Sequence, residues 1–159
     1  MSANSRLTLA VHALTWMAQP VHLDEFATSE QIAHSVNTNP VILRGLLGMM
    51  AKQQLVSVQR GNNAGWKLAR KPEEITLLDA YRAVKPDPLF SLHHTPPNQC
   101  CIIGYGISPT LQEVYAHAQQ ALDQELAGTT IADILRDTIA RQRQAREALP
   151  LPDAELQYT

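Results

Sequence analysis

The sequence predicts a mostly α-helical fold with one small β-hairpin, in which two closely spaced helices and the hairpin precede a long amphipathic helix. Helix-start signals stand at Thr28 and Asn39. Alternating segments over 56–60 and 66–69 then flank a turn rich in glycine and asparagine. Further on, apolar residues recur at intervals of three and four over 108–126. These three observations define the expected architecture.

The composition fits either one folded domain or a small domain with an appendage. The chain has 159 residues, and 45% of them are hydrophobic, which is enough to bury a core. A formal net charge of −2 conceals an asymmetry, because residues 1–84 hold eight basic and six acidic side chains and residues 85–159 hold five and nine. Within 28–71, six basic side chains stand against Glu30 alone. The six are Arg44, Lys52, Arg60, Lys67, Arg70 and Lys71. This charge favours a polyanionic partner.

Nothing in the sequence predicts export or insertion into a membrane. No window approaches about eighteen consecutive apolar residues, and the N-terminus lacks the pattern of a signal peptide. The two cysteines, Cys100 and Cys101, are adjacent and cannot form a framework of ordinary disulfides. We therefore expect a cytoplasmic protein without membrane contact. The sequence also lacks a phosphate-binding loop and a nucleophile elbow, so we do not expect an enzyme.

The first helix is expected over 5–18 and is apolar on more than one side. One face carries Leu7, Ala10, Val11, Leu14 and Met17, and a second carries Leu9, Ala13 and Trp16. We expect such a helix to contribute side chains both to the core and to an interface. Residues 19–27, which include Pro20, are predicted to form a loop.

Two short helices joined by a tight turn are expected next. Thr28 and Gln31 have the spacing of a capping box, which starts a helix of about two turns. After the polar break over 37–39, Asn39 can cap a second helix with Pro40 in its first turn. The pair of helices is a helix-turn-helix candidate.

The second of these helices combines an apolar face with a polar one. Its apolar face is predicted from the spacing of Ile42, Leu46 and Met49. Arg44 and Lys52 remain for another face. Gly45 and Gly48 also fall inside this helix, where each costs about 1 kcal/mol relative to alanine. They either permit close approach of another backbone or leave the helix loose until it binds.

The hairpin completes a recognisable order of elements. Residues 61–65 form its turn, and Arg60 and Lys67 make it basic. A helix-turn-helix followed directly by a basic hairpin is the order of a winged helix, whose second helix enters the DNA major groove. The residues expected to contact DNA are Ser29, Thr38, Asn39, Pro40, Val41, Arg44, Arg60, Asn62, Asn63 and Lys67.

Each of these residues also has an ordinary structural explanation. Thr38 and Asn39 could do no more than cap the helix, and Val41 could join the core. Arg60 and its neighbours could merely protect a hairpin edge from aggregation.

Three further segments follow the hairpin. Thr76 is expected to cap a helix that ends near Val84, and proline-rich residues 85–107 are expected to form a connecting or sensing loop. The long helix is expected to begin with Pro109, and the stripe that would hold a dimer comprises Leu111, Val114, Tyr115, Ala118 and Leu122. Thr130 and Asp133 are predicted to cap a last helix that runs to about Arg141. The expected units are 1–84, 85–107, 108–146 and a flexible tail over 147–159.

The connecting loop contains the candidate sensor residues His93, His94, Cys100 and Cys101. The positive end of the long helix can lower the pKa of a nearby thiol, which makes a thiol switch chemically reasonable. Unpaired cysteine is also often a small buried hydrophobe, so this alternative stays open. The spacing fits no standard zinc pattern, and we expect neither a metal site nor a cofactor.

Five segments carry a resemblance to a known family. They are Ser5–Leu7, Ser29–Ala33, Asn37–Val41, Arg60–Arg70 and Pro72–Val84, the last being the most specific. Together they resemble the Rrf-type winged-helix regulators, the family of IscR, NsrR and CymR. Cys101–Gly104 is similar to the Cys-Pro-Val-Gly segment of its YwnA-like branch.

The resemblance implies a dimeric transcription factor, usually a repressor, whose long helix packs against that of its partner. It also implies that the loop senses a signal. Cluster-binding members of the family offer three spaced cysteines there, whereas this chain has one adjacent pair, so a standard iron-sulfur cluster is not expected.

The main functional hypothesis is a homodimer that binds an inverted-repeat operator in double-stranded DNA. Its effector is open, either thiol oxidation or a small molecule in the gap between the long helix and the winged domain. The alternative is a protein-interaction module of the same fold with weak or no DNA binding.

Overall fold

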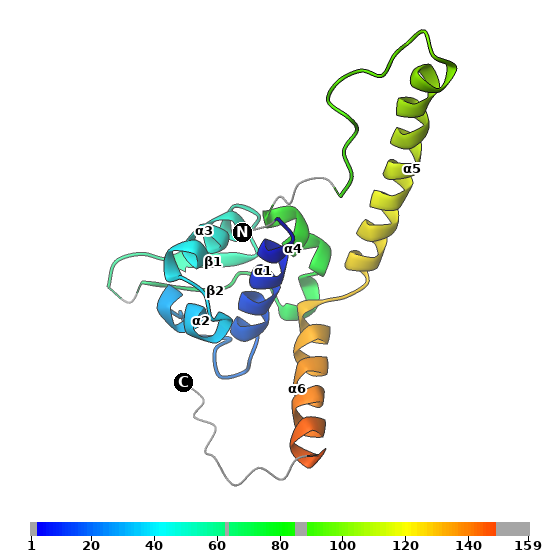
Figure 1. Ribbon diagram of the computed structural model, residues 1–159. Coiled ribbons are helices and arrows are strands. Elements are labelled where there is room, and N and C mark those ends of the chain that lie inside the picture. The colour runs from blue at the N-terminus through cyan, green and yellow to red at the C-terminus, as the bar shows by residue number, and fades with distance from the viewer. Residues whose placement is uncertain (1–2, 63, 85–88, 149–159) are drawn as a thin grey trace.

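The computed structural model describes residues 3–62, 64–84 and 89–148 (Figure 1). Asn63 and most of the predicted tail over 147–159 lie outside the described residues. The described elements are α1 (Ala3–Met17), α2 (Ser29–Val36), α3 (Pro40–Lys52), β1 (Val56–Gln59), β2 (Gly65–Leu68), the 3₁₀ turn η1 (Pro72–Glu74), α4 (Leu77–Val84), α5 (Ile102–Ala127) and α6 (Ile131–Ala148). They confirm a mostly α-helical fold with a winged helix-turn-helix and a long helix.

The central element of the main body is α1. It packs against α2, α3, α4 and α6, and the antiparallel hairpin of β1 and β2 lies beside α3 (Figure 1). The long helix α5 projects away from this body and contacts it through α4. None of the helices in the described ranges is long and apolar enough to cross a membrane.

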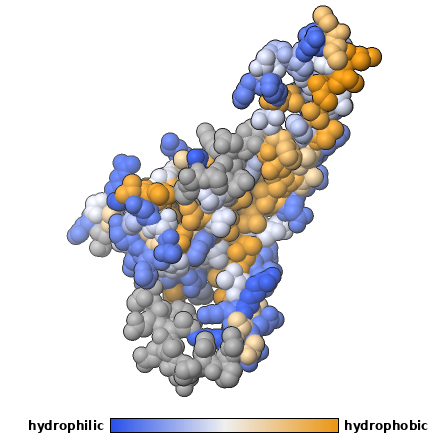
Figure 2. Space-filling view, in the orientation of Figure 1, coloured by the Kyte–Doolittle hydropathy of each residue, from blue (hydrophilic) through white to orange (hydrophobic). Residues whose placement is uncertain are grey.

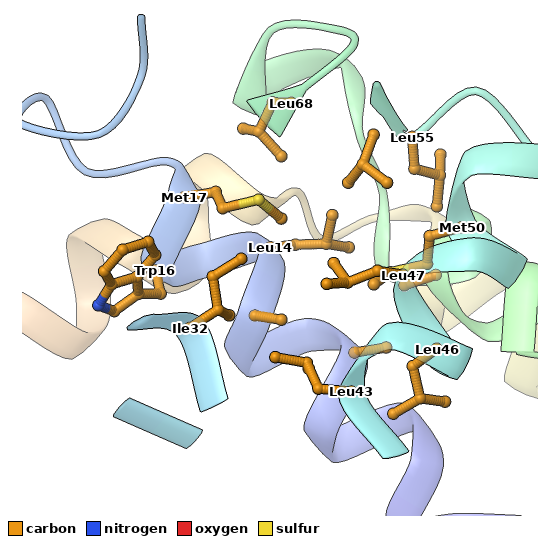
Figure 3. Packing of buried hydrophobic residues seen from close by; sticks show 14 of the residues in the cluster. Leu14, Trp16, Met17, Ile32, Leu43, Leu46, Leu47, Met50, Leu55 and Leu68 are labelled. Carbon is orange, nitrogen blue, oxygen red and sulfur yellow. The ribbon is translucent and has the colours of Figure 1, made fainter. Parts of the chain in front are cut away.

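The core forms around the several apolar sides of α1, as the sequence predicts. Figure 3 shows Leu14 and Met17 of α1 pointing towards side chains from α3 and the hairpin. Both are almost completely buried, and burying a side chain of this size contributes about 1.5–3 kcal/mol. Ile131, the first residue of α6, is fully buried in the same cluster, so α6 belongs to the main body.

The buried face of α3 differs from the expected one. Its buried residues are Leu43, Leu46, Leu47 and Met50. Ile42 and Met49 are exposed, so the prediction that they share the core face with Leu46 is wrong. Two apolar spacings coexist in this helix, and packing against α1 and α4 selects one of them.

The long helix starts earlier than predicted. α5 begins at Ile102, with Cys101 as its N-cap and Pro109 inside it, so the expected start at Pro109 is wrong. Proline is expected in a first turn because it lacks a backbone N–H, and inside the helix it leaves the Tyr105 carbonyl without its usual donor. The Thr110 hydroxyl donates to the neighbouring Gly106 carbonyl at 2.8 Å. The last helix also runs further than predicted, to Ala148.

Candidate nucleic-acid interface

The helix-turn-helix is fixed by local hydrogen bonds that its sequence predicts. Thr28 and Gln31 form the capping box, with Thr28 N donating to Gln31 Oε1 at 2.8 Å and Gln31 N donating to Thr28 Oγ1 at 3.2 Å. Asn37 ends α2 with φ of 55°, in the left-handed region that asparagine tolerates. Asn39 Oδ1 then accepts from Val41 N at 2.8 Å and caps α3. The turn therefore sets the angle between the two helices.

The hairpin is attached to the loop that precedes α2. Ala27 and Trp66 form an isolated antiparallel bridge, in which Ala27 N donates to Trp66 O at 2.9 Å and Trp66 N donates to Ala27 O at 2.8 Å. At Gly65, a Cβ atom would come within 3.0 Å of Phe26 and Ala27, so this close approach requires glycine. The bridge holds the hairpin beside the start of α2.

A groove of about 360 Å³ separates the start of α2 from the hairpin. Arg44 of α3 and Arg60 of the hairpin line it together with the first residues of α2. Glu30 also lines it, and the Ser29 hydroxyl donates to Glu30 Oε2 at 3.1 Å. The backbone N–H of Glu30 and the Ser29 hydroxyl lower the pKa of the Glu30 carboxyl, and Arg44 adds to the effect. Two guanidinium groups at a helix start suit a phosphate backbone.

The outer face of α3 is exposed and partly apolar. Val41 is 66% exposed, which excludes the alternative that it joins the core. Ile42 and Met49 of the same helix are exposed as well. At Gly45, a Cβ atom would meet no heavy atom within 4 Å, so packing within the chain does not require glycine there. Sequence reasoning missed Ile42 and Met49 as surface residues, and the apolar positions 43, 46, 47 and 50 were the signal that could have revealed them.

Two of the expected DNA contacts, Ser29 and Lys67, are engaged with other residues of the chain. Ser29 is only 5% exposed, and its hydroxyl is engaged with Glu30. Lys67 is half-buried, with its Nζ atom 4.8 Å from the centre of the Phe26 ring. Asn63 lies outside the described residues. Arg70, part of the basic cluster, is paired with Asp79 at 3.3 Å, so it adds less charge to the surface than the sequence count suggests.

The remaining candidates lie at the helix-turn-helix and at the tip of the hairpin. Asn39 and Asn62 are exposed, whereas Thr38 and Pro40 are half-buried. Thr38 N donates to Ala33 O at 3.1 Å, so the backbone of Thr38 helps to end α2.

Cys100 and Cys101 are both exposed in the single chain, so neither belongs to its core. The Asn98 backbone passes so close to Gly104 that any Cβ there would collide with its carbonyl oxygen. The Asn98 side chain accepts from Cys100 N at 3.0 Å, which holds the loop against the helix start. The backbone N–H groups of Gly104 and Ile103 lower the pKa of the Cys101 thiol. The lowered pKa makes Cys101 a candidate for thiol chemistry.

The histidines of the loop do not join the cysteines. His93 and His94 are exposed, and the His93 Nδ1 atom lies 2.8 Å from the Thr95 carbonyl oxygen. Both line a hollow between the loop and α5 together with Tyr115.

The projecting arm is formed by α5 and the loop that leads into it. It carries an exposed apolar surface, visible as orange side chains along the arm and at its tip in Figure 2. Ile102 is 87% exposed and Val114 is 55% exposed. Tyr115 stacks on Phe90, with ring centres 5.0 Å apart. Of the predicted stripe, Leu111, Tyr115, Ala118 and Leu122 are half-buried and Val114 is exposed.

Comparison with known proteins gives consistent matches. A family model described as Rrf2, iron-dependent transcriptional regulator, matches residues 3–137. The chain is 38% identical over 133 residues to YwnA of Bacillus subtilis (strain 168), a candidate HTH-type transcriptional regulator, and the match covers 83% of this chain and 96% of YwnA. The crystal structure of a candidate DNA-binding protein is 33% identical, with a TM-score of 0.65, over 82% of this chain and 98% of that one. IscR of T. potens shares the fold, with 22% identity and a TM-score of 0.61 over 97% and 94% of the two chains.

The residues of this chain do not fit the iron that the family model's description implies. An iron-sulfur cluster is held mainly by several cysteine thiolates, and this chain has two adjacent cysteines. Among the described residues, no group of three or more His, Cys, Asp or Glu side chains could hold a metal ion.

Proposed function

The chain belongs to the Rrf2 family of transcriptional regulators, and from this premise we propose that it is a homodimeric repressor that binds an inverted-repeat operator. The groove between α2 and the hairpin supports this proposal most directly, because it brings Arg44 and Arg60 together beside the exposed face of α3. In this arrangement α3 reads base edges in a major groove. The hairpin contacts the adjacent backbone or minor groove.

The sequence-specific step rests on the outer face of α3. Arg44 supplies the hydrogen-bond donors that guanine accepts, and the exposed Val41 suits contact with a thymine methyl group. Arg60 neutralises phosphate charge, together with the exposed Lys52 and Lys71. Binding should therefore weaken steeply as the salt concentration rises.

Dimerisation rests on the projecting arm. α5 carries apolar side chains outside the main body, and a second copy of the chain has the same surface to bury. Near its C-terminal end, α5 is tied to α4 by an ion pair between Arg82 and Asp123 at 3.1 Å. Two such arms packed together would fix the separation of two DNA-reading helices, as an inverted repeat requires.

The test is selection of bound sequences from a random pool of DNA duplexes at two salt concentrations. The parent protein should enrich an inverted repeat, and Arg44→Ala and Arg60→Ala should each weaken binding about 5- to 150-fold. Arg143→Ala, an exposed change on α6, is the matched control and should bind like the parent. Failure to enrich any sequence would favour a protein-interaction module instead.

The dimer and the repressor role are tested separately. Val114→Glu puts a charge on the exposed apolar stripe and should shift the protein towards monomer in analytical ultracentrifugation. Gln112→Glu adds the same charge on an exposed position outside the predicted stripe and should leave the dimer intact. Transcription in vitro from a promoter that carries the selected repeat should fall when the parent protein is added, and a rise would mean an activator.

A thiol response is a second candidate, favoured by the exposure and lowered pKa of Cys101. Oxidation to a sulfenic acid, or a disulfide between the two chains, would change the start of α5. An oxidant such as hydrogen peroxide should then release the parent from its operator but not Cys101→Ser. If it releases Cys100→Ser/Cys101→Ser equally, the thiol response is wrong.

A further inference from the structure

A second groove lies on the side of the main body formed by α1 and α6. It has a volume of about 740 Å³, within the usual range for small-molecule sites. Figure 1 shows α6 running alongside α1, and Ser35 near the end of α2 closes part of the groove. The groove is distinct from the one that carries Arg44 and Arg60.

The lining of this groove is neutral. Leu7 and Val11 of α1 and Ile134 of α6 supply apolar surface, and Trp16 adds an aromatic edge. None of the described residues that line it is Asp, Glu, Lys or Arg. A charged ligand would lose its hydration there without gaining an opposite charge, so the lining selects against it.

Seven lining residues carry histidine, hydroxyl or amide side chains, and two of them, Thr15 and Gln19, already donate to backbone carbonyl groups of α1. His12 Nε2 lies 3.3 Å from Ser35 Oγ. Partial burial lowers the pKa of His12 below its ordinary value, which favours the neutral imidazole. Thr138 of α6 contributes a hydroxyl group to the lining. The groove therefore combines apolar walls with hydrogen-bonding groups that carry no fixed charge.

One wall of the groove, α6, is anchored more firmly at its start than further along. α6 is fixed at its start, where Ile131 is fully buried and its N–H donates to the Ile75 carbonyl at 2.8 Å. From Arg136 to Ala148 every side chain is exposed, so little burial resists a small tilt of this part of the helix. The same helix follows directly after α5, and Ser35 belongs to the helix-turn-helix. A molecule between α1 and α6 thus contacts α2 of the helix-turn-helix and also α6, the helix that follows α5.

We propose that the groove between α1 and α6 binds a neutral, largely apolar small molecule with one or two hydrogen-bonding groups, and that this binding alters operator affinity. The binding step is independent of the proposed DNA-binding function, and the effect on operator affinity rests on it. A ligand changes the DNA-bound population only if it binds the free and DNA-bound forms unequally. In this proposal the two forms differ by a tilt of α6, whose second half is exposed.

The binding test uses two dyes with one skeleton. N-phenyl-1-naphthylamine is neutral, and 1-anilinonaphthalene-8-sulfonate carries a charge. Titrated into the full-length protein without DNA, the neutral dye should give a saturable rise in fluorescence with one site per chain. The sulfonate should bind at least about tenfold more weakly, as the uncharged lining requires. No saturable binding of the neutral dye, or equal binding of both dyes, would overturn the proposal.

Variants on the exposed side of α6 locate the bound dye. Thr138→Trp and Gln142→Trp both fill the groove from positions that are exposed, and either should abolish binding of the neutral dye. Gln144→Trp, exposed on the same helix outside the groove, is the matched control. Retained binding in both filled variants would place the dye elsewhere and refute the site.

Two other occupants give different results, and either would overturn the proposal. If a second chain fills the groove, Thr138→Trp will dissociate the dimer in analytical ultracentrifugation. If the C-terminal residues of the same chain fill it, the parent will not bind the dye but Leu156→Asp will.

The regulatory step is measured last, on the selected operator duplex. Saturating neutral dye should change the dissociation constant of the parent for this duplex by about fivefold or more, and it should not affect Thr138→Trp. Dye binding without this change would refute the regulatory role. If the protein binds no duplex at all, the proposed function fails while the ligand site stands.

Discussion

Thr76 and Thr130 each cap a helix, and the two caps face one another across an isolated antiparallel bridge. Thr76 N donates to Asp79 Oδ2 and Thr130 N donates to Asp133 Oδ2, each at 3.0 Å. The hydroxyl oxygen of each threonine accepts from the backbone N–H of the same aspartate at 3.1 Å. The starts of α4 and α6 are thus joined in one network, through which the segment after α5 is attached to the main body.

Removing one cap should weaken the whole domain. Thr130→Ala deletes the hydroxyl that caps α6 and should lower the free energy of unfolding by about 1 kcal/mol. Urea denaturation followed by circular dichroism measures this change. Thr138→Ala, an exposed change within the same helix, should stay within about 0.5 kcal/mol of the parent. A loss of equal size in both variants would show that the cap has no special role.

The same network predicts that the stability of the protein depends on pH. The backbone and hydroxyl groups of Thr130 lower the pKa of the Asp133 carboxyl from its ordinary 3.8, and Arg136 adds to this effect. Its contribution to stability should therefore be complete above the unfolded-state value and disappear as the pH falls through the lower folded-state pKa. The difference in urea midpoint between the parent and Asp133→Asn should be constant near neutral pH and shrink below pH 3.8. A difference that grows on acidification would contradict the assignment.

Glu30 should restrain binding to all DNA. Its carboxylate lines the groove beside Arg44 and Arg60, where it repels phosphate. Glu30→Gln is expected to raise affinity for unrelated duplexes and for the operator alike, about two- to fivefold at low salt. Fluorescence anisotropy at several salt concentrations measures both affinities. Glu73→Gln, exposed on η1 and outside the groove, should have no such effect.

Substitution of Gly45 by alanine should raise the stability of the protein and lower its affinity for DNA. A Cβ atom at this position meets nothing within 4 Å in the free protein, so Gly45→Ala should stabilise α3 by about 0.5–1 kcal/mol. Bound DNA would lie against the same surface, where the added methyl group should weaken operator binding about tenfold or more. Gly106→Ala in α5 is the control, because its Cβ is also unobstructed but lies far from α3. Unchanged operator affinity in Gly45→Ala would mean that DNA does not approach this position.

The sequence by itself determined the elements whose starts depend on local hydrogen bonds. Thr28 with Gln31 and Asn39 with Pro40 predicted α2 and α3, because a cap is complete within four residues of chain. The alternation on either side of the hairpin turn predicted β1 and β2 for the same reason. These local signals, in their order along the chain, were enough for the fold class and for the placement of Arg44 on α3 and of Arg60 on the hairpin.

Tertiary packing decided what local patterns leave ambiguous. The residues of α3 offer two apolar spacings, and contact with α1 and α4 buried Leu43 and Leu47 while leaving Ile42 and Met49 in solvent. α5 starts at Ile102, where the Asn98 backbone lies close to Gly104. The preference of proline for the first turn of a helix takes no account of such a contact. The two grooves exist only because segments distant in sequence pack together. Periodicity and caps are properties of neighbouring residues, whereas a buried face or a cavity is a property of the surfaces that meet there.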